Sequence, residues 1–359
     1  MKTRTNAERK GIAGIGLIAL DILLQNDSGV SSVAAGGTCG NVMAILSLLG
    51  WNASPVGRLM PDTCADTIST DLKAWGVNTS FLNLAPHAVA PAIVERLRLD
   101  SAGIPFHSFT FSCPWCGERL PSYQPVTIPS IRAATEALLD NDVLFVDRAS
   151  PGAVELALQF HAHGKIIVFE PSSSRVDHLF HKLLSISNVV KYSHERFPEL
   201  EELVWPKDRK LEVQTLGRGG LRFRTARQGR VSAWQHLSAP VSKTVVDTCG
   251  AGDWATAGLI ELLCKEGLGS LMGMSKEGVL NALGFAQRLG SWNCGYAGAR
   301  GSMYTMSRTL LLRTIAQLAG SGVLNLPVVE GTVPSPNKHA ANCGICSTQN
   351  DLGKVSGHR

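Results

Sequence analysis

Short apolar runs alternate with longer helical patterns along most of this chain, and this alternation is the feature that most constrains its fold. Four runs are typical of buried strands and lie at residues 11–20, 142–147, 165–170 and 211–217. Helical patterns lie at residues 41–49, 65–75, 130–139, 151–163 and 253–265. Strands that are apolar almost throughout suit a parallel sheet that is covered on both faces. The sequence therefore predicts an α/β fold, with a doubly wound and mostly parallel sheet between layers of helices.

The segment 87–112 interrupts this alternation. Its two extended runs, "AIVERLRLD" and "PFHSFTF", flank a turn at Gly103 and predict a β-hairpin. We expect this hairpin to project from the main sheet as a small lid, whose outer surface could also join two copies of the chain as a homodimer. The helix and strand pattern fades toward the carboxyl terminus, so we expect one domain over 11–325, with an insertion at 112–125, and a polar tail over 326–359.

The amino-acid composition limits which kinds of molecule the protein is expected to bind. The chain has 359 residues, of which 44% are hydrophobic and 18% charged, as in a globular protein. Its net charge of +5 is mild and its basic residues are scattered, so neither nucleic acid nor a membrane is expected as a partner. The first residues are basic and the next are apolar, as in a secretory signal peptide. Because Asp21 interrupts the apolar run, we expect a buried first strand instead. Most of the nine cysteines stand alone in apolar segments, which favours a cytoplasmic protein.

The stretch "VVDTCGAGDWATAGLIELL" contains the most informative motif. A strand ending near Val246 and a helix beginning near Gly250 would leave the first N–H groups of the helix free to bind an anion. The small residues Gly250, Ala251 and Gly252 permit the close approach that such binding requires. Asp253 then falls in the first helical turn, where its carboxylate can accept a hydrogen bond from a substrate hydroxyl. The alternative is a glycine turn that only lets the helix pack tightly on the strand.

Several motifs in the same order resemble those of the ribokinase-like (PfkB) family of sugar and nucleoside kinases. "DTCGAGD" followed by "ATAGLI" resembles the carboxy-terminal signature of that family, and "GGTCGNVMAILSLLG" at 36–50 resembles its amino-terminal signature. The resemblance extends over about residues 12 to 305 and includes "GIGLIALD", "VGRLMPD", "WGVNTSFL", "VQTLGRGG" and "GYAGARGSM". Two signatures in the correct order are far more specific than one glycine loop.

The resemblance implies transfer of the γ-phosphoryl group of ATP to a hydroxyl, in particular a hydroxymethyl group, of a small sugar or nucleoside. It makes Asp253 the catalytic base and Gly250, Ala251 and Gly252 an anion hole. It also makes Asp21 an acid that binds two substrate hydroxyls. The residues that it places against the sugar are Gly36, Gly37 and Asn41. By the residues alone, Asp21 could be a surface carboxylate at a strand end, and 36–41 a turn with a helix cap.

For the nucleotide, the resemblance implies a phosphate loop that contains Thr215, Gly217 and Gly220, and it places Gln287 on the adenine side. As a residue in a helical pattern, Gln287 could equally be an exposed polar side chain. Magnesium is expected with ATP, because phosphoryl transfer depends on a cation that bridges the phosphates.

The segment "KYSHER" at 191–196 departs from the family pattern. The family often carries Asn-x-x-Glu here, whereas this chain has Ser193 and Arg196 at those positions and Glu195 shifted by one. We therefore expect Lys191 or Arg196 to contact the nucleotide phosphates, with Glu195 close by. Cys39 and Met43 stand where the first signature usually has small residues, so the sugar pocket is expected to have an unusual shape.

Two C-x2-C pairs lie outside the family pattern. Cys113 and Cys116 precede Gly117, and Cys343 and Cys346 lie in the tail. Together four thiolates could complete one tetrahedral, structural zinc site. A redox pair and unrelated surface cysteines are the alternatives.

Two other functions are compatible with these observations. One is a kinase of a heterocyclic alcohol, such as a vitamin precursor, and the other is a non-catalytic protein that retains the fold as a sugar-sensing or zinc-bearing module. The presence of Asp253 argues against loss of catalysis, and the "KYSHER" departure argues mildly for it.

Overall fold

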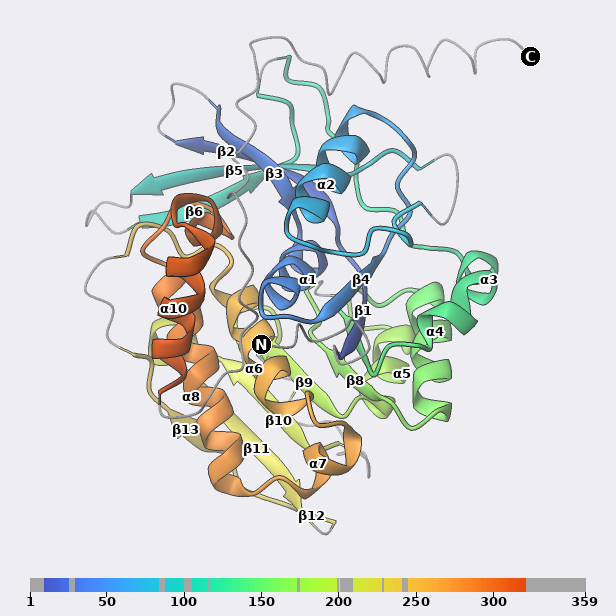
Figure 1. Cartoon of the computed structure of the whole chain (residues 1–359), viewed down its shortest axis with the longest axis vertical. Coiled ribbons are helices and arrows are strands. Elements are labelled where there is room, and N and C mark those ends of the chain that lie inside the picture. The colour runs from blue at the N-terminus through green and yellow to red at the C-terminus, as the bar shows by residue number, and fades with distance from the viewer. Residues whose placement is uncertain are drawn as a thin grey trace, which may run out of the picture.

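A mostly parallel sheet forms the centre of the molecule (Figure 1). The computed structural model describes residues 10–25, 30–83, 88–99, 105–114, 116–172, 175–198, 200, 209–227, 229–240 and 245–320. The parallel strands are, in spatial order, β4 (Asn52–Val56), β1 (Gly11–Ile15), β7 (Val143–Val146), β8 (Ile166–Phe169), β9 (Val189–Ser193) and β10 (Leu211–Thr215). Antiparallel strands continue the sheet beyond β10, namely β11 (Leu221–Arg227), β12 (Arg230–Val231) and β13 (Gln235–Leu237). The predicted fold class is confirmed.

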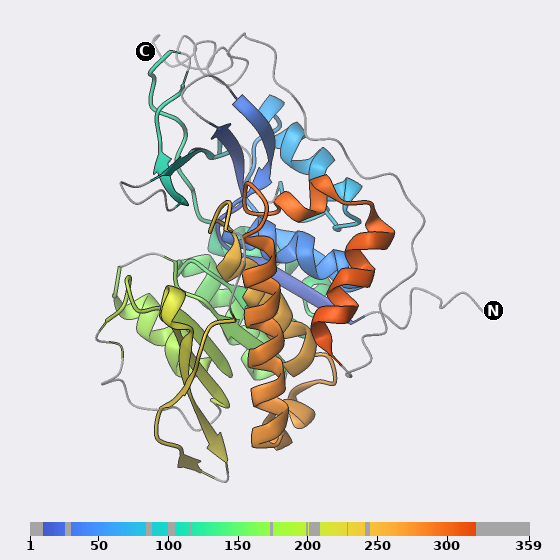
Figure 2. The same ribbon diagram turned by 90° about the vertical axis from the view of Figure 1, so that its left-hand side faces the viewer.

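Helices cover both faces of this sheet (Figure 2). One face carries α1 (Thr38–Leu48), α2 (Thr63–Ala74), α6 (Ala251–Leu263), α8 (Lys276–Asn293) and α10 (Arg308–Ala319), and the other carries α3 (Ile128–Leu138), α4 (Pro151–Ala162) and α5 (His178–Ile186). Two short helices are α7 (Leu268–Gly273) and α9 (Gly301–Thr305). Alternate residues of β7 enter the two cores, because successive strand side chains point to opposite faces. Among the described helices, none is both long and apolar enough to cross a bilayer.

The expectation of one strand over 11–20 is wrong. The chain leaves the main sheet after β1 and begins a new strand, β2 (Ala19–Gln25), in a second sheet. The break lies at Gly16, whose φ is +156°, and a Cβ there would lie 1.4 Å from Oδ1 of Asp147. That same oxygen accepts the N–H of Leu17 at 2.8 Å. The buried carboxylate therefore replaces a ladder partner and lets the chain turn out of the sheet.

The second sheet is the lid, and it is larger than the hairpin that the sequence predicts. The hairpin is present as β5 (Ala92–Leu99) and β6 (Pro105–Thr110), whereas the expected turn at Gly103 lies outside the described residues. The strands β2 and β3 (Val30–Gly36) extend it to the order β3-β2-β5-β6. One face of the lid packs Leu20, Ile22 and Val94 into the core shared with α1 and α2. The opposite face turns toward the ends of the main strands.

Candidate active site

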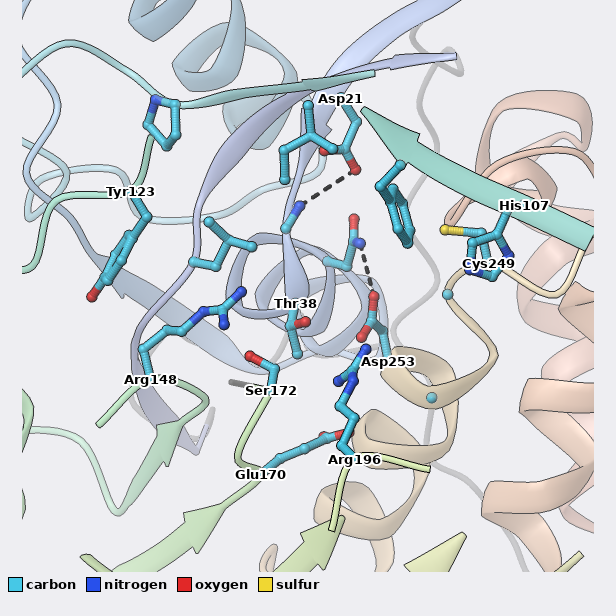
Figure 3. A pocket seen from close by; sticks show the side chains of 18 of the residues that line it. Asp21, Thr38, His107, Tyr123, Arg148, Glu170, Ser172, Arg196, Cys249 and Asp253 are labelled. Atoms are coloured by element: carbon cyan, nitrogen blue, oxygen red, sulfur yellow. Dashed lines mark hydrogen bonds between the residues drawn. The ribbon is translucent and has the colours of Figure 1, made fainter. Parts of the chain in front are cut away.

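A cavity of about 400 Å³ lies between the lid and the carboxyl ends of the parallel strands (Figure 3). This edge is where ligands bind in open α/β sheets, because strand ends and helix starts meet there. The cavity is lined by the lid, by the starts of α1 and α6, by residues that follow β7 and β8, and by residues within or just after β9 and at the end of β10. Of the residues predicted from the sequence, those that line it are Asp21, Gly37, Asn41, Lys191, Arg196, Thr215, Gly250, Gly252 and Asp253.

Asp253 lies in the first turn of α6, as predicted, and faces the cavity (Figure 3). Its Oδ2 accepts a hydrogen bond from Nδ2 of Asn41 at 2.8 Å. Burial and the nearby charge of Glu170 raise the pKa of Asp253 to about 7, although the Asn41 hydrogen bond opposes the shift. A carboxylate with this pKa is well suited to take a proton from an alcohol at neutral pH.

The start of α6 also has the backbone geometry of an anion site. Gly250 is left-handed, with φ +73°, and a Cβ there would lie 2.1 Å from the carbonyl oxygen of Ala299. The N–H of Ala251 donates to Thr248 O and that of Trp254 to Gly250 O. No such backbone bond joins the N–H groups of Gly252 and Asp253 to the described residues. These two amides can therefore hold an anionic oxygen.

The described residues 245–250 form a loop and contain no strand, whereas residues 241–244, where most of the expected strand would lie, are outside the described residues. The N–H groups of Val246 and Asp247 both donate to Cys294 O, which lies just after α8, and not to the main sheet. This loop is anchored further by Asp247, whose carboxylate accepts the N–H of Cys249 at 2.9 Å and that of Gly298 at 2.7 Å.

Asp21 lies within β2, and its side chain points down from the lid into the cavity (Figure 3). Its Oδ2 accepts the N–H of Gly37 at 3.4 Å. A Cβ at Gly36 would lie 1.8 Å from that same oxygen, so only glycine leaves room for the carboxylate. Burial raises the pKa of Asp21 to about 6, with the Gly37 amide and Arg300 opposing the rise. Asp21 thus lies inside a lid strand rather than at a strand end, and its side chain lines the cavity.

Arg300 fixes the orientation of Asn41, and the sequence analysis did not identify it. Its Nε donates to Oδ1 of Asn41 at 3.1 Å, and its Nη2 donates to Asp71 at 2.7 Å. Arg300 is 2% exposed. Because the amide oxygen of Asn41 is held by Arg300, its NH₂ group must face Asp253. The only sequence signal was the presence of Arg300 in "GYAGARGSM".

A buried ion pair forms the part of the cavity below Asp253. Nζ of Lys191, in the middle of β9, donates to Glu170, which follows β8. The hydroxyl of Thr256 in α6 donates to the other oxygen of Glu170. Glu170 is 8% exposed and Lys191 is 3% exposed. The predicted residue Lys191 is thus in the site, and its acidic partner is a residue that the sequence analysis missed.

The remaining residues predicted for the nucleotide have different positions. Thr215 lines the cavity at the end of β10, and Gly217 and Gly220 form the positive-φ turn that follows it. Glu195 is exposed in the turn after β9 and is not among the lining residues, whereas Arg196 is. Gln287 donates to Leu237 O at 3.2 Å and so ties α8 to β13.

Tyr123, Arg148 and Ser172 are among the lining residues for which the sequence analysis predicted no role (Figure 3). The hydroxyl of Tyr123 and Nε of Arg148 are buried and have no hydrogen-bond partner among the described residues. Groups of this kind are satisfied by a bound polar ligand.

The insertion at 112–125 contains a tight turn between Cys113 and Gly117. The N–H of Gly117 donates to Cys113 O at 3.0 Å, and Gly117 has φ +76°. Cys113 is buried and Cys116 is exposed. Cys343 and Cys346 lie outside the described residues.

Comparison with solved structures gives close agreement in fold at low sequence identity. An uncharacterized sugar kinase from Pyrococcus horikoshii superposes with a TM-score of 0.64 at 17% identity, over 86% of this chain and 99% of that one. A ribokinase from Giardia lamblia gives 0.64 at 16% identity, over 86% and 99%. The chain has the ribokinase fold. An aminoimidazole riboside kinase from Salmonella enterica, complexed with its riboside and an ATP analog, gives 0.62 at 17% identity, over 87% and 100%.

The ribokinase fold thus confirms the resemblance found in the sequence, at the level of architecture. No family model matches this chain, and no curated protein matches it by sequence. What the ribokinase-fold cavity does in this chain must therefore be argued from its own residues.

Proposed function

We propose that this protein is an ATP-dependent kinase that transfers the γ-phosphoryl group to a hydroxyl, preferably a hydroxymethyl group, of a sugar or nucleoside. The observation that supports this most is the position of Asp253. Its carboxylate lies at the bottom of the cavity, and Asp21 lies in the roof of the cavity. The backbone N–H groups of Gly252 and of Asp253 itself, which make no backbone hydrogen bond to the described residues, are at the same helix start. A base and an anion site side by side are what phosphoryl transfer to an alcohol requires.

In the proposed reaction, Asp21 and the NH₂ group of Asn41 hold hydroxyls of the acceptor through charge-assisted and neutral hydrogen bonds. The hydroxyl to be phosphorylated lies against Asp253, which accepts its proton as the oxygen attacks the γ-phosphorus. The bond between the γ-phosphorus and the oxygen that bridges it to the β-phosphate breaks, and the electron pair of that bond stays on the oxygen, which leaves as part of ADP. The amides of Gly252 and Asp253 stabilise the charge on the transferred group.

The nucleotide is proposed to lie beyond Asp253, toward β9 and β10. Lys191, Arg196 and Thr215 line that part of the cavity and supply two cations and a hydroxyl for phosphate oxygens. Glu170 is the buried carboxylate at this end and fits magnesium, which takes one or two carboxylates together with phosphate oxygens. When bound with ATP, magnesium would neutralise charge on the β- and γ-phosphates.

The test is ADP release by the purified protein with ATP and magnesium, against pentoses, hexoses, nucleosides and heterocyclic alcohols. We expect turnover with at least one sugar or nucleoside, and its loss in Asp253→Asn. Asp140→Asn, which changes an exposed acid far from the cavity, is the matched control. Nucleotide binding without turnover on any acceptor would refute the kinase and favour the non-catalytic sensor.

We also propose that Cys113 and Cys116 hold a structural zinc ion together with Cys343 and Cys346. The turn at Cys113–Gly117, with its left-handed glycine, supports half of this site. The homodimer through the lid stays a prediction, and exposed Leu99 and Phe111 near its edge are the residues that such a contact would cover.

A further inference from the structure

Three ligand-type side chains meet where the lid touches the body of the molecule, and the reaction proposed above uses none of them. Glu95 comes from β5, His107 from β6, and Asp247 from the loop before α6. One donor atom from each lies within 4.8 Å of the other two. Figure 3 shows His107 on its lid strand directly beside this loop. The three residues join two lid strands to one body loop.

Hydrogen bonds satisfy this group only in part, since Nδ1 of His107 contacts the Thr248 hydroxyl at 3.2 Å and Asp247 accepts two backbone N–H groups. Nδ1 of His107 lies 3.7 Å from Oδ1 of Asp247, which is beyond hydrogen-bond distance. Glu95 is 2% exposed, and its Oε1 is buried with no hydrogen-bond partner among the described residues. A buried carboxylate oxygen without a partner is costly, and here it is beside a second buried carboxylate. A cation at this point would give the unpartnered Oε1 of Glu95 a partner and offset the repulsion between the two carboxylates.

We propose that Glu95, His107 and Asp247 bind a divalent transition-metal ion such as zinc, which bridges the lid to the loop that carries the anion site. Ligands of a tetrahedral zinc ion, with bonds of about 2.1 Å, lie about 3.4 Å apart, so the 3.7 Å separation needs little adjustment. One imidazole and two carboxylates favour zinc and its neighbours, whereas magnesium and calcium prefer oxygen ligands alone.

The residues around Asp247 fix the orientation of its carboxylate, which suits a metal ligand. It is completely buried, and each of its oxygens accepts one backbone N–H, from Cys249 and from Gly298. Such outer partners fix the direction of a ligand and leave further lone pairs for the metal. His107 is 25% exposed, so an ion can enter from the cavity side. Its Nδ1 is 3.2 Å from the hydroxyl of Thr248, a contact that the ion would replace.

Binding has a mechanical consequence. The loop that contains Asp247 leads within three residues to Gly250, while Glu95 and His107 move with the lid that carries Asp21. An ion shared by both parts holds the lid closed over the cavity. Zinc is therefore expected to slow exchange of acceptor and product, and so to inhibit turnover.

The test is calorimetric titration of the full-length, metal-stripped protein with zinc, in buffer that contains excess magnesium to fill sites for hard cations. Glu95→Gln and His107→Ala are compared with wild type, and His161→Ala, which removes an exposed histidine of α4, is the matched control. All four proteins retain all nine cysteines, so zinc held by thiolates is common to them. The relevant quantity is the difference in bound zinc between variants.

We expect wild type and His161→Ala to bind one more zinc ion per chain than Glu95→Gln or His107→Ala. If these two variants still bind that ion, we expect them to bind it at least about 100-fold more weakly, because loss of a residue that only orients a metal ligand usually weakens binding by less. Cobalt should report the same site through visible absorption that His107→Ala loses. Equal zinc binding in all four proteins would overturn the proposal. If Glu95→Gln does not fold, as judged by circular dichroism, the partly exposed His107→Ala decides the result alone.

Discussion

Replacing Asp253 by Asn should remove activity and at the same time stabilise the fold. The pKa of Asp253 is raised from 3.8 to about 7, mainly by burial. A carboxyl group whose pKa is raised by folding destabilises the folded state when it is ionised. This loss of stability is negligible below about pH 4 and grows with pH until the pH exceeds the pKa of the group in the folded protein. At 1.36 kcal/mol for each pKa unit, the upper limit is about 4 kcal/mol above pH 7. An amide of the same shape avoids this cost and can still accept from Asn41.

Loss of the base should lower kcat by about 10²-fold or more, which corresponds to about 2.7 kcal/mol in the barrier. The KM for ATP should change little, because the proposed phosphate contacts come from β9 and β10. The wild-type kcat/KM should fall as the pH drops below 7, since protonated Asp253 cannot accept a proton.

The assay is paired. Turnover is measured by ADP release, and the free energy of unfolding by urea denaturation at pH 5 and pH 8. The stability gain of Asp253→Asn over wild type should be larger at pH 8 than at pH 5. A variant with near-normal turnover would refute the assignment of the base. A variant that is inactive and less stable at both pH values would refute the electrostatic reasoning.

Four further predictions concern the acceptor, the nucleotide and the cysteines. Asp21→Ala should raise the acceptor KM or abolish turnover without changing ATP affinity, and lost ATP affinity with normal acceptor dependence would contradict our placement of the pocket. Gly36→Ala should imitate this effect, by about 10-fold or more in acceptor kcat/KM, because its Cβ would displace the Asp21 carboxylate. Lys191→Met should leave Glu170 buried and unpaired and lower the free energy of unfolding by about 3–5 kcal/mol, and unchanged urea denaturation would show that the ion pair is not intact. The double change Cys343→Ser and Cys346→Ser should lower elemental zinc by about one ion per chain and make the tail sensitive to protease, and a metal-free wild type that is stable and active would exclude the structural zinc site.

The sequence by itself determined the features that depend on residues close together in the chain. Strand and helix periodicity, read over a few residues at a time, predicted β7, β8 and β10 and the helices α1 to α4 and α6 to within three residues at each end. The glycines before Asp253 predicted a helix start that binds anions, because the free N–H groups of a first turn are a local property. The same holds for Asp21, Gly37 and Asn41, whose identities and order carried the family resemblance.

Only the tertiary structure decided which distant groups meet. Arg300 orients Asn41 across 259 positions of sequence, Glu170 joins Lys191 across 21, and no local period encodes either pairing. The lid gained β2 because Asp147, 130 positions away from Leu17, accepts that residue's N–H and breaks the run that appeared to be one strand. A buried polar side chain needs a hydrogen-bond partner, but its position in the chain does not show which residue that partner is. Long-range packing brings the partner within reach, and for that reason the donor atoms of Glu95, His107 and Asp247 come within 4.8 Å of one another only in the folded molecule.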